Sequence, residues 1–149
     1  MASDSNNITW TQVTASFTAT RSVLSVIFGF DSSSEVYVLI DDVSIVRTAN
    51  PSVELLDNPG FDNSISNPTG WDAWCSNTCG SSSGGVVTNI GCRTGYCYKG
   101  QCRGGNNVDY VVQTFPAISG QSYTWEYWHR RMRTTSGSSG SATLYAAII

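Results

Sequence analysis

Two adjacent carboxylates, Asp41 and Asp42, interrupt the otherwise apolar run YVLIDDVSIV. Alternate residues of a strand share a face, so the pattern places Asp41 on one face with Leu39, Val43 and Ile45. A buried unpaired charge is costly, so this carboxylate needs either a cation or N–H donors. The residues alone leave both partners open.

The aromatic segment SYTWEYWHRRM is a second group of residues that could bind a ligand. Its alternation separates two sets of side chains, and one of these sets contains Glu126, Trp128 and Arg130. An indole ring stacks on the apolar face of a sugar, while a carboxylate accepts and a guanidinium donates hydrogen bonds. The three residues therefore form a candidate sugar platform, with Tyr110 on a neighbouring strand and Trp74 in a loop as candidate additions. The alternative is that a loop or a neighbouring subunit covers Trp128.

Catalytic chemistry has little support in this sequence. His129 is the single histidine, and no GxSxG motif accompanies it. Glu126 has no evident carboxylate partner for glycoside hydrolysis. The glycine-rich stretch GSSSGG lacks the lysine of a phosphate-binding loop. We therefore expect a protein that is not an enzyme.

Five cysteines, Cys75, Cys79, Cys92, Cys97 and Cys102, lie in glycine- and serine-rich sequence. This density favours the disulfides of a secreted domain. A zinc site and unpaired thiols are the alternatives, and the spacing lacks the CxxC pairs of a closed zinc site. The preferred pairing is Cys75–Cys79 and Cys92–Cys102, with Cys97 as a strand residue.

Length and charge restrict the class of protein further. A chain of 149 residues with 13% charged residues and a net charge of −3 indicates one domain without a general affinity for nucleic acid. No apolar run reaches the roughly 18 residues of a membrane span, so membrane insertion is not expected. The sequon at Asn7 makes this residue a glycosylation candidate and agrees with an extracellular location.

Alternating and β-branched segments predict an all-β protein, an antiparallel β-sandwich. No sustained helical period is present. The segment 47–52 is interpreted as a linker, because Pro51 interrupts any strand. The expected strands are 10–19, 22–30, 35–46, 96–99, 108–117, 122–132 and 142–149.

Three segments resemble the jelly-roll carbohydrate-binding modules, a family of galactose-binding-like β-sandwiches. LLDNPGFDNSISNPTGW (55–71) is similar to their opening segment, VVQTFPAISGQSYTWEYWHRR (111–131) to their central segment, and residues 10–46 to their closing segment. The order is changed, because the closing segment comes first. The resemblance implies one jelly-roll domain with a permuted order of strands, made of closing strands in 1–50 and opening strands in 52–149. The chain is thus circularly permuted or cut from a tandem repeat.

The resemblance also implies a structural calcium ion. The acidic residue of the closing strand, Asp41 or Asp42, and that of the opening motif, Asp62, would bind it, with backbone carbonyls around Asn58 to Gly60. Asp62 stands where the family usually has Glu.

The expected function is a non-catalytic, extracellular carbohydrate-binding module that recognises glycans on a sheet groove. The alternative is a structural repeat of an extracellular fibre or adhesive array. Copies would then assemble head-to-tail, each completing the strands of its neighbour.

Overall fold

The computed structural model describes residues 9–32, 35–76, 85–102, 107–134 and 140–149. The described residues form ten strands, and none of them forms a helix that could cross a membrane. The strands are β1 (Thr11–Thr18), β2 (Val23–Ser32), β3 (Val36–Arg47), β4 (Asn50–Glu54), β5 (Asp72–Cys75), β6 (Val86–Thr88), β7 (Cys97–Gly100), β8 (Asp109–Pro116), β9 (Ser122–Arg133) and β10 (Ala142–Ile148).

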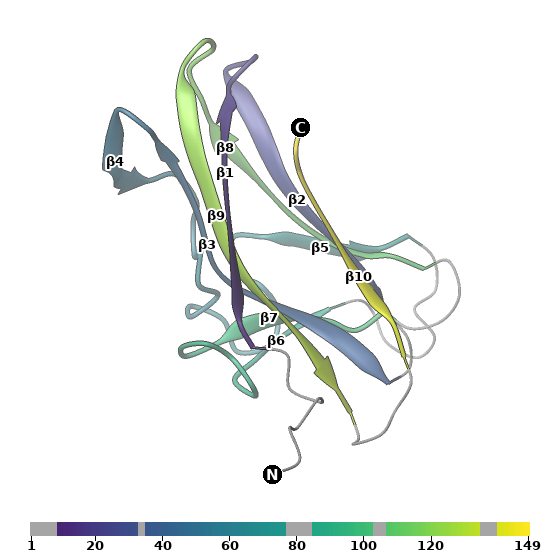
Figure 1. Cartoon of the computed structure of the whole chain (residues 1–149). Helices are drawn as coiled ribbons and strands as arrows, with labels where there is room; N and C mark the ends of the chain where they lie inside the picture. Colours follow the sequence, from purple (N-terminus) through teal and green to yellow (C-terminus); the bar gives the residue numbers. More distant parts are fainter. Residues whose placement is uncertain (1–8, 33–34, 77–84, 103–106, 135–139) are drawn as a thin grey trace.

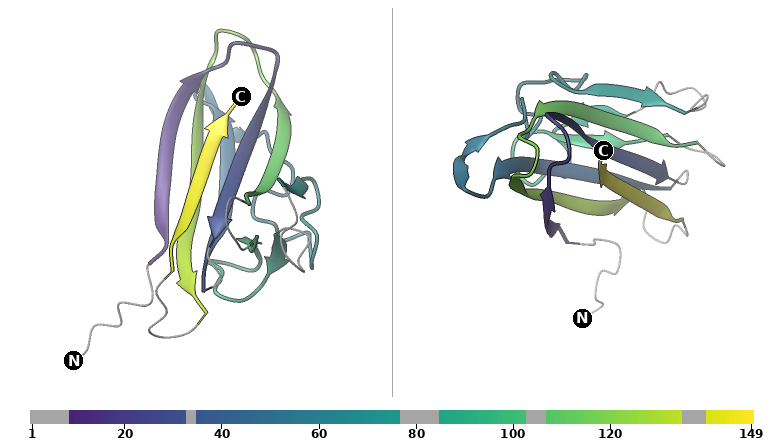
Figure 2. Two further views of the ribbon diagram at one scale, coloured as in Figure 1. Left: turned by 90° about the vertical axis from the view of Figure 1, so that its right-hand side faces the viewer. Right: turned by 90° about the horizontal axis from the view of Figure 1, so that it is seen from above.

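The strands form two antiparallel sheets packed as a sandwich (Figure 1). Sheet A has the order β1-β9-β3-β7-β6, and β4 pairs with β3. Sheet B has the order β10-β2-β8-β5. In the left view of Figure 2, sheet B faces the reader, with β10 (yellow), β2 and β8 in front of sheet A. The predicted fold class, an all-β antiparallel sandwich, is confirmed.

Alternation along the strands builds the core between the sheets. In sheet B, Phe28 and Phe30 of β2 are fully buried, as is Val111 of β8. In sheet A, Tyr123 and Tyr127 of β9 point inward, and the Tyr127 ring meets Phe28 edge-on at 5.0 Å between centroids. The aromatic strand thus contributes one face to the core, as its pattern predicts.

The early and late parts of the chain complete one another within a single molecule. In sheet A, β3 pairs with β9 from Val36↔Arg133 to Arg47↔Tyr123, and β1 lies on the other side of β9. In sheet B, β2 lies between β8 and β10. Both sheets therefore need strands from both parts, and one copy of the chain supplies them.

Two expectations about local structure are wrong. The expected linker, 47–52, overlaps β4, in which Pro51 is tolerated because β4 pairs only with β3 among the described strands and leaves its other edge open. The short strands β5 and β6 were not expected, because three or four residues carry too little alternation to be recognised.

The turn after β8 has a further consequence for the candidate site. Gly120, with φ at +83°, turns the chain from β8 in sheet B to β9 in sheet A. Tyr110 on β8 therefore lies in a different sheet from Trp128 on β9 and is not its neighbour. The predicted sugar platform is split between the two sheets.

Candidate functional site

A β-bulge in β3 decides where the paired aspartates point. Asp41 is opposite Trp128, but Ser44 is opposite Glu126, so β3 has one extra residue in this interval. Asp42 adopts φ = +46° at this point. The extra residue reverses the alternation, so Val43 lies in the core while Asp41 lies on the outer face of sheet A.

The expected common face of Leu39, Asp41, Val43 and Ile45 is therefore wrong. Leu39 pairs with Arg130 on the outer face, and Ile45 belongs to the core cluster. Asp41 is nevertheless fully buried. It is covered by the Arg93 loop, a name used here for residues 89–96, and not by the core.

Backbone N–H groups are the partners of Asp41. Its Oδ2 accepts hydrogen bonds from the N–H of Arg93 at 3.1 Å and of Thr94 at 3.3 Å. Its Oδ1 accepts from the N–H of Asp42 at 2.8 Å. Burial, with the nearby charge of Asp42, raises the pKa of Asp41 from 3.8 to about 7 despite these donors. The carboxylate anchors the Arg93 loop to β3.

The side chain of Arg93 occupies the space in front of the predicted platform. Its guanidinium forms an ion pair with Asp42 and lies 4.0 Å from the ring centroid of Trp128. A cation over an indole face is a favourable contact, and it covers the surface that a sugar ring would need. Trp128 is thus covered by a loop, which was the alternative to sugar binding.

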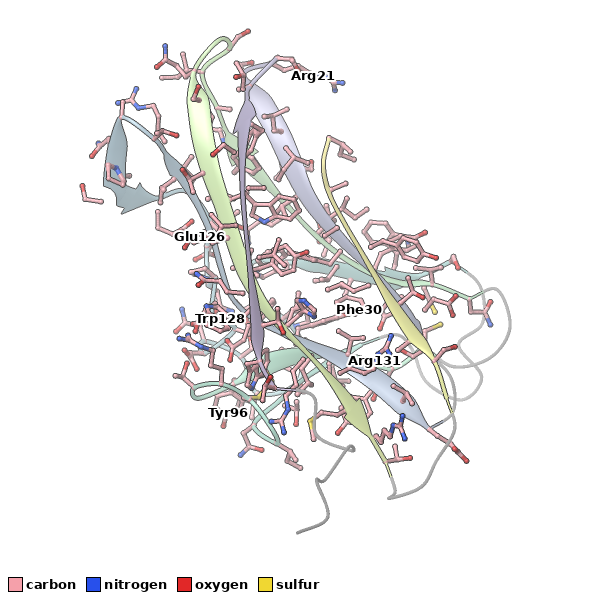
Figure 3. All side chains as sticks on the ribbon, in the orientation of Figure 1. Arg21, Phe30, Tyr96, Glu126, Trp128 and Arg131 are labelled. Carbon is pink, nitrogen blue, oxygen red and sulfur yellow. A yellow bond between two sulfur atoms is a disulfide. The ribbon has the colours of Figure 1, made fainter. Side chains whose placement is uncertain are left out.

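The other two platform residues also have protein partners. Glu126 accepts hydrogen bonds from Gln12 at 3.4 Å and Thr14 at 3.3 Å, both on β1. Arg130 donates to the carbonyl of Gly91 at 3.2 Å. Figure 3 labels Glu126 and Trp128 along β9. These side chains of β9 hold β1 and the Arg93 loop against β9.

A disulfide closes the Arg93 loop. Cys92 and Cys97 are bonded, so the expected pair Cys92–Cys102 is wrong. Cys97 is the first residue of β7, as expected, but it is bonded and not left out of the pairing, and its Cα lies 5.4 Å from that of Cys92. Cys75 and Cys102 each take part in a disulfide as well. Cys79, and with it the expected Cys75–Cys79 pair, lies outside the described residues, as does Asn7.

The predicted calcium ligands divide into two groups. Both oxygens of Asp41 accept N–H groups, and Asn58 uses its side chain within its own loop, where Oδ1 accepts the N–H of Asn63 at 3.0 Å and Nδ2 donates to Thr69. These two side chains do not fit a metal ion. The described residues contain no group of three His, Cys, Asp or Glu side chains that could hold one.

Asp42 and Asp62 fit a cation better. A Cβ on Gly60 would lie 3.1 Å from Asp62 Oδ2 and 3.5 Å from Asp42 Oδ1, so a residue without a side chain leaves room between two carboxylate oxygens. Neither oxygen accepts a hydrogen bond from a described residue, whereas Asp62 Oδ1 accepts the N–H of Tyr96 at 2.9 Å. Backbone carbonyls and water would have to supply the other ligands of calcium.

The remaining predicted sugar residues meet on the outer face of sheet B. Trp74 on β5 is directly opposite Tyr110 on β8, and their rings stack with centroids 5.3 Å apart and planes 23° from parallel. Trp74 is 43% exposed. Gly29 on β2 is directly opposite Tyr110, on the side of β8 away from β5. The Tyr110 ring packs on Gly29, and a Cβ at position 29 would lie only 3.1 Å from this ring. A side chain at position 29 would push this ring away.

Sequence reasoning missed the next residue of this row. Tyr145 on β10 is opposite Gly29 and is 54% exposed. Trp74, Tyr110 and Tyr145 thus follow one line across four neighbouring strands, which we call the aromatic row. With strands about 4.8 Å apart, the row spans about 14 Å. Alternation in ATLYAAI places Tyr145 outward, but the line appears only once the sheet order β10-β2-β8-β5 is known.

Fold and site together define a disulfide-containing, two-layer antiparallel β-sandwich that exposes a row of aromatic side chains on one sheet. No protein-family model matches the sequence, and neither a curated protein nor a solved structure matches it significantly.

Proposed function

We propose that this protein is a non-catalytic, extracellular carbohydrate-binding module that holds glycans on the aromatic row of sheet B. The stacked pair of the exposed Trp74 and the half-buried Tyr110 carries the proposal. Such rings offer apolar faces to the C–H groups of sugar rings, and their exposure on a monomer otherwise needs an explanation. The resemblance to jelly-roll carbohydrate-binding modules and the Cys92–Cys97 disulfide support the class and the extracellular location.

The aromatic row is a better candidate than the residues on sheet A. Trp128 has Arg93 on its ring, whereas Trp74 and Tyr145 expose theirs. Asp72 on β5 lies two residues from Trp74 on the same face and is exposed, so it supplies a hydrogen-bond acceptor beside the rings. Stacking with a few flanking polar groups suits a glycan chain laid across the strands.

A glycan array, followed by affinity electrophoresis in gels that contain the polysaccharides it identifies, tests the proposal. We expect Trp74→Ala and Tyr145→Ala each to weaken binding about tenfold, because each removes one ring contact. Ile90→Ala is the matched control, since it removes an exposed apolar side chain elsewhere. Absence of binding to any glycan, or a loss with Trp128→Ala but not with Trp74→Ala, would reject the aromatic row.

Head-to-tail assembly makes a different prediction. Since one chain already supplies both sides of each sheet, a carbohydrate-binding module of this kind is monomeric, at 16.1 kDa in light scattering. Open polymers that grow with protein concentration would favour the fibre or adhesive array instead.

A further inference from the structure

A cavity of about 350 Å³ opens between the two sheets, beside β10, the strand on which the aromatic row ends at Tyr145. Val38, His129 and Arg131 line it from sheet A, and Ala142, Thr143 and Leu144 line it from sheet B. It lies where β9 extends beyond the start of β1, whose Thr11 is opposite His129. In the part of the chain that the structure describes, β1 does not extend over this space between β9 and β10.

The polar side chains that line this cavity are those of Arg131, His129 and Thr143, so its only charged groups are basic. Arg131 donates a hydrogen bond to the carbonyl of Ala142, which extends its guanidinium across from β9 to β10. Figure 3 shows Arg131 between the lower ends of these strands. His129 packs on the Tyr127 ring at 6.1 Å and faces the same space. None of the lining residues is acidic, and the described residues give Arg131 no carboxylate partner.

A buried hydroxyl beside the cavity also lacks a partner. Ser32 is opposite Ala142, lies on the inner face of sheet B and is 3% exposed. Its Oγ has no hydrogen-bond partner among the described residues. Buried polar groups without partners are rare, and a ligand or water in the adjoining space satisfies such a group.

We propose that this cavity binds a carboxylate group, that of a uronic acid in a glycan. A guanidinium matches a carboxylate with two parallel N–H donors, and an imidazole N–H adds a third donor. Val38, Ala142 and Leu144 form an apolar wall for the C–H side of a sugar ring. The cavity lies between the sheets and shares no lining residue with the aromatic row, so its test is independent of the proposed function.

Two-dimensional ¹H–¹⁵N NMR titration of the full chain with D-glucuronate, D-glucose and acetate tests this proposal. We expect glucuronate to shift the amide resonances of Val38, Ala142 and Leu144, with a dissociation constant in the millimolar range, and glucose to leave them unchanged. Acetate distinguishes the two sources of a carboxylate. Weaker binding of acetate assigns the site to a uronic acid, whereas equal binding assigns it to the carboxylate alone and removes the sugar from the proposal.

Matched variants locate the binding. Arg131→Gln is expected to weaken glucuronate binding about tenfold, because hydrogen bonds to a charged group are lost. Arg21→Gln, at the opposite end of the molecule (Figure 3), changes the net charge equally and should have no effect. If Arg131→Gln fails to fold, His129→Gln supplies the test. Unshifted amides, or equal losses with Arg21→Gln, would overturn the proposal.

Discussion

The guanidinium of Arg93 lies 4.0 Å from the centroid of the Trp128 ring while it is paired with the carboxylate of Asp42. This contact joins the Arg93 loop to β9 and to the bulge of β3. It explains why an outward-facing tryptophan on an exposed sheet is only half-buried and still unsuited to a sugar. The side chain of Arg93 covers the face of the Trp128 ring on which a sugar would have to stack.

Arg93→Ala should therefore uncover Trp128. We expect a loss of about 1 kcal/mol in the free energy of unfolding, because a partly exposed cation–π contact and a partly exposed ion pair are both modest. The indole N–H resonance of Trp128, assigned with Trp128→Phe, should exchange faster with solvent. Arg21→Ala is the control for the loss of a surface arginine. Unchanged exchange would mean that Arg93 does not cover the ring in solution.

Asp41 gives the protein a specific dependence on pH. Its pKa is 3.8 when unfolded and about 7 when folded, so between these values the unfolded chain releases a proton that the folded chain retains. The contribution of this group to stability is therefore fully present below pH 3.8 and is lost as the pH rises through 7. Across this window we expect a loss on the order of 4 kcal/mol.

Urea unfolding at pH 4.5 and 7.5, in EDTA, measures this effect. Asp41→Asn should show a smaller loss between the two pH values, because its amide does not titrate, whereas the exposed Asp72→Asn should behave like the wild type. Burial also raises the pKa of Asp109, so this residue too makes the protein less stable as the pH rises. Burial and the charge of Arg131 lower the pKa of His129, and this residue makes the protein more stable as the pH rises. The difference between Asp41→Asn and wild type removes both contributions. Equal losses of unfolding free energy between pH 4.5 and 7.5 in the wild type and in Asp41→Asn would contradict the buried position of Asp41.

The contrast between Asp41 and the aromatic strand shows what the sequence could predict. Periodic alternation put Tyr123 and Tyr127 on one face of the strand and Trp128 on the other, because an uninterrupted strand keeps its two faces, and the family resemblance assigned the first face to the core. The same rule failed at Asp41, since a one-residue bulge leaves no mark on the pattern of apolar residues. A bulge depends on the register with β9, which is a property of the folded sheet.

The sequence also did not predict which residues far apart in the chain become neighbours in the fold. Tyr110 and Trp128 lie on consecutive strands, β8 and β9, yet the turn at Gly120 sends these strands to opposite sheets. Tyr145 joined the aromatic row only through the order of four strands. The cysteine pairing failed for the same reason, because several pairings are compatible with the spacing and only the position of β7 selects Cys92–Cys97.

The Cys92–Cys97 disulfide should stabilise the Arg93 loop. Peptide mapping of the unreduced protein by mass spectrometry is expected to find these two residues linked. Replacing both by serine should cost about 2 kcal/mol, the entropy of closing a short loop. Because Asp41 receives two of its N–H donors from this loop, the double variant should also reduce the protection of those amides from hydrogen exchange. A Cys92–Cys102 peptide would restore the pairing expected from the sequence and contradict the loop described here.

The last prediction concerns calcium binding. Of the four side chains predicted as ligands, only those of Asp42 and Asp62 remain candidates. If a cation sits beside Gly60, millimolar calcium should raise the melting temperature by a few degrees over EDTA, because an ion that binds only the folded state stabilises it. Asp62→Asn should abolish the shift while its Oδ1 still accepts the N–H of Tyr96. Asp72→Asn is the control, since it removes an exposed carboxylate from β5. Equal melting temperatures in calcium and EDTA would contradict a calcium site. In that case the contact between the early and late parts of the chain would depend on the Arg93–Asp42 ion pair and on the N–H groups that Asp41 accepts, without a metal ion.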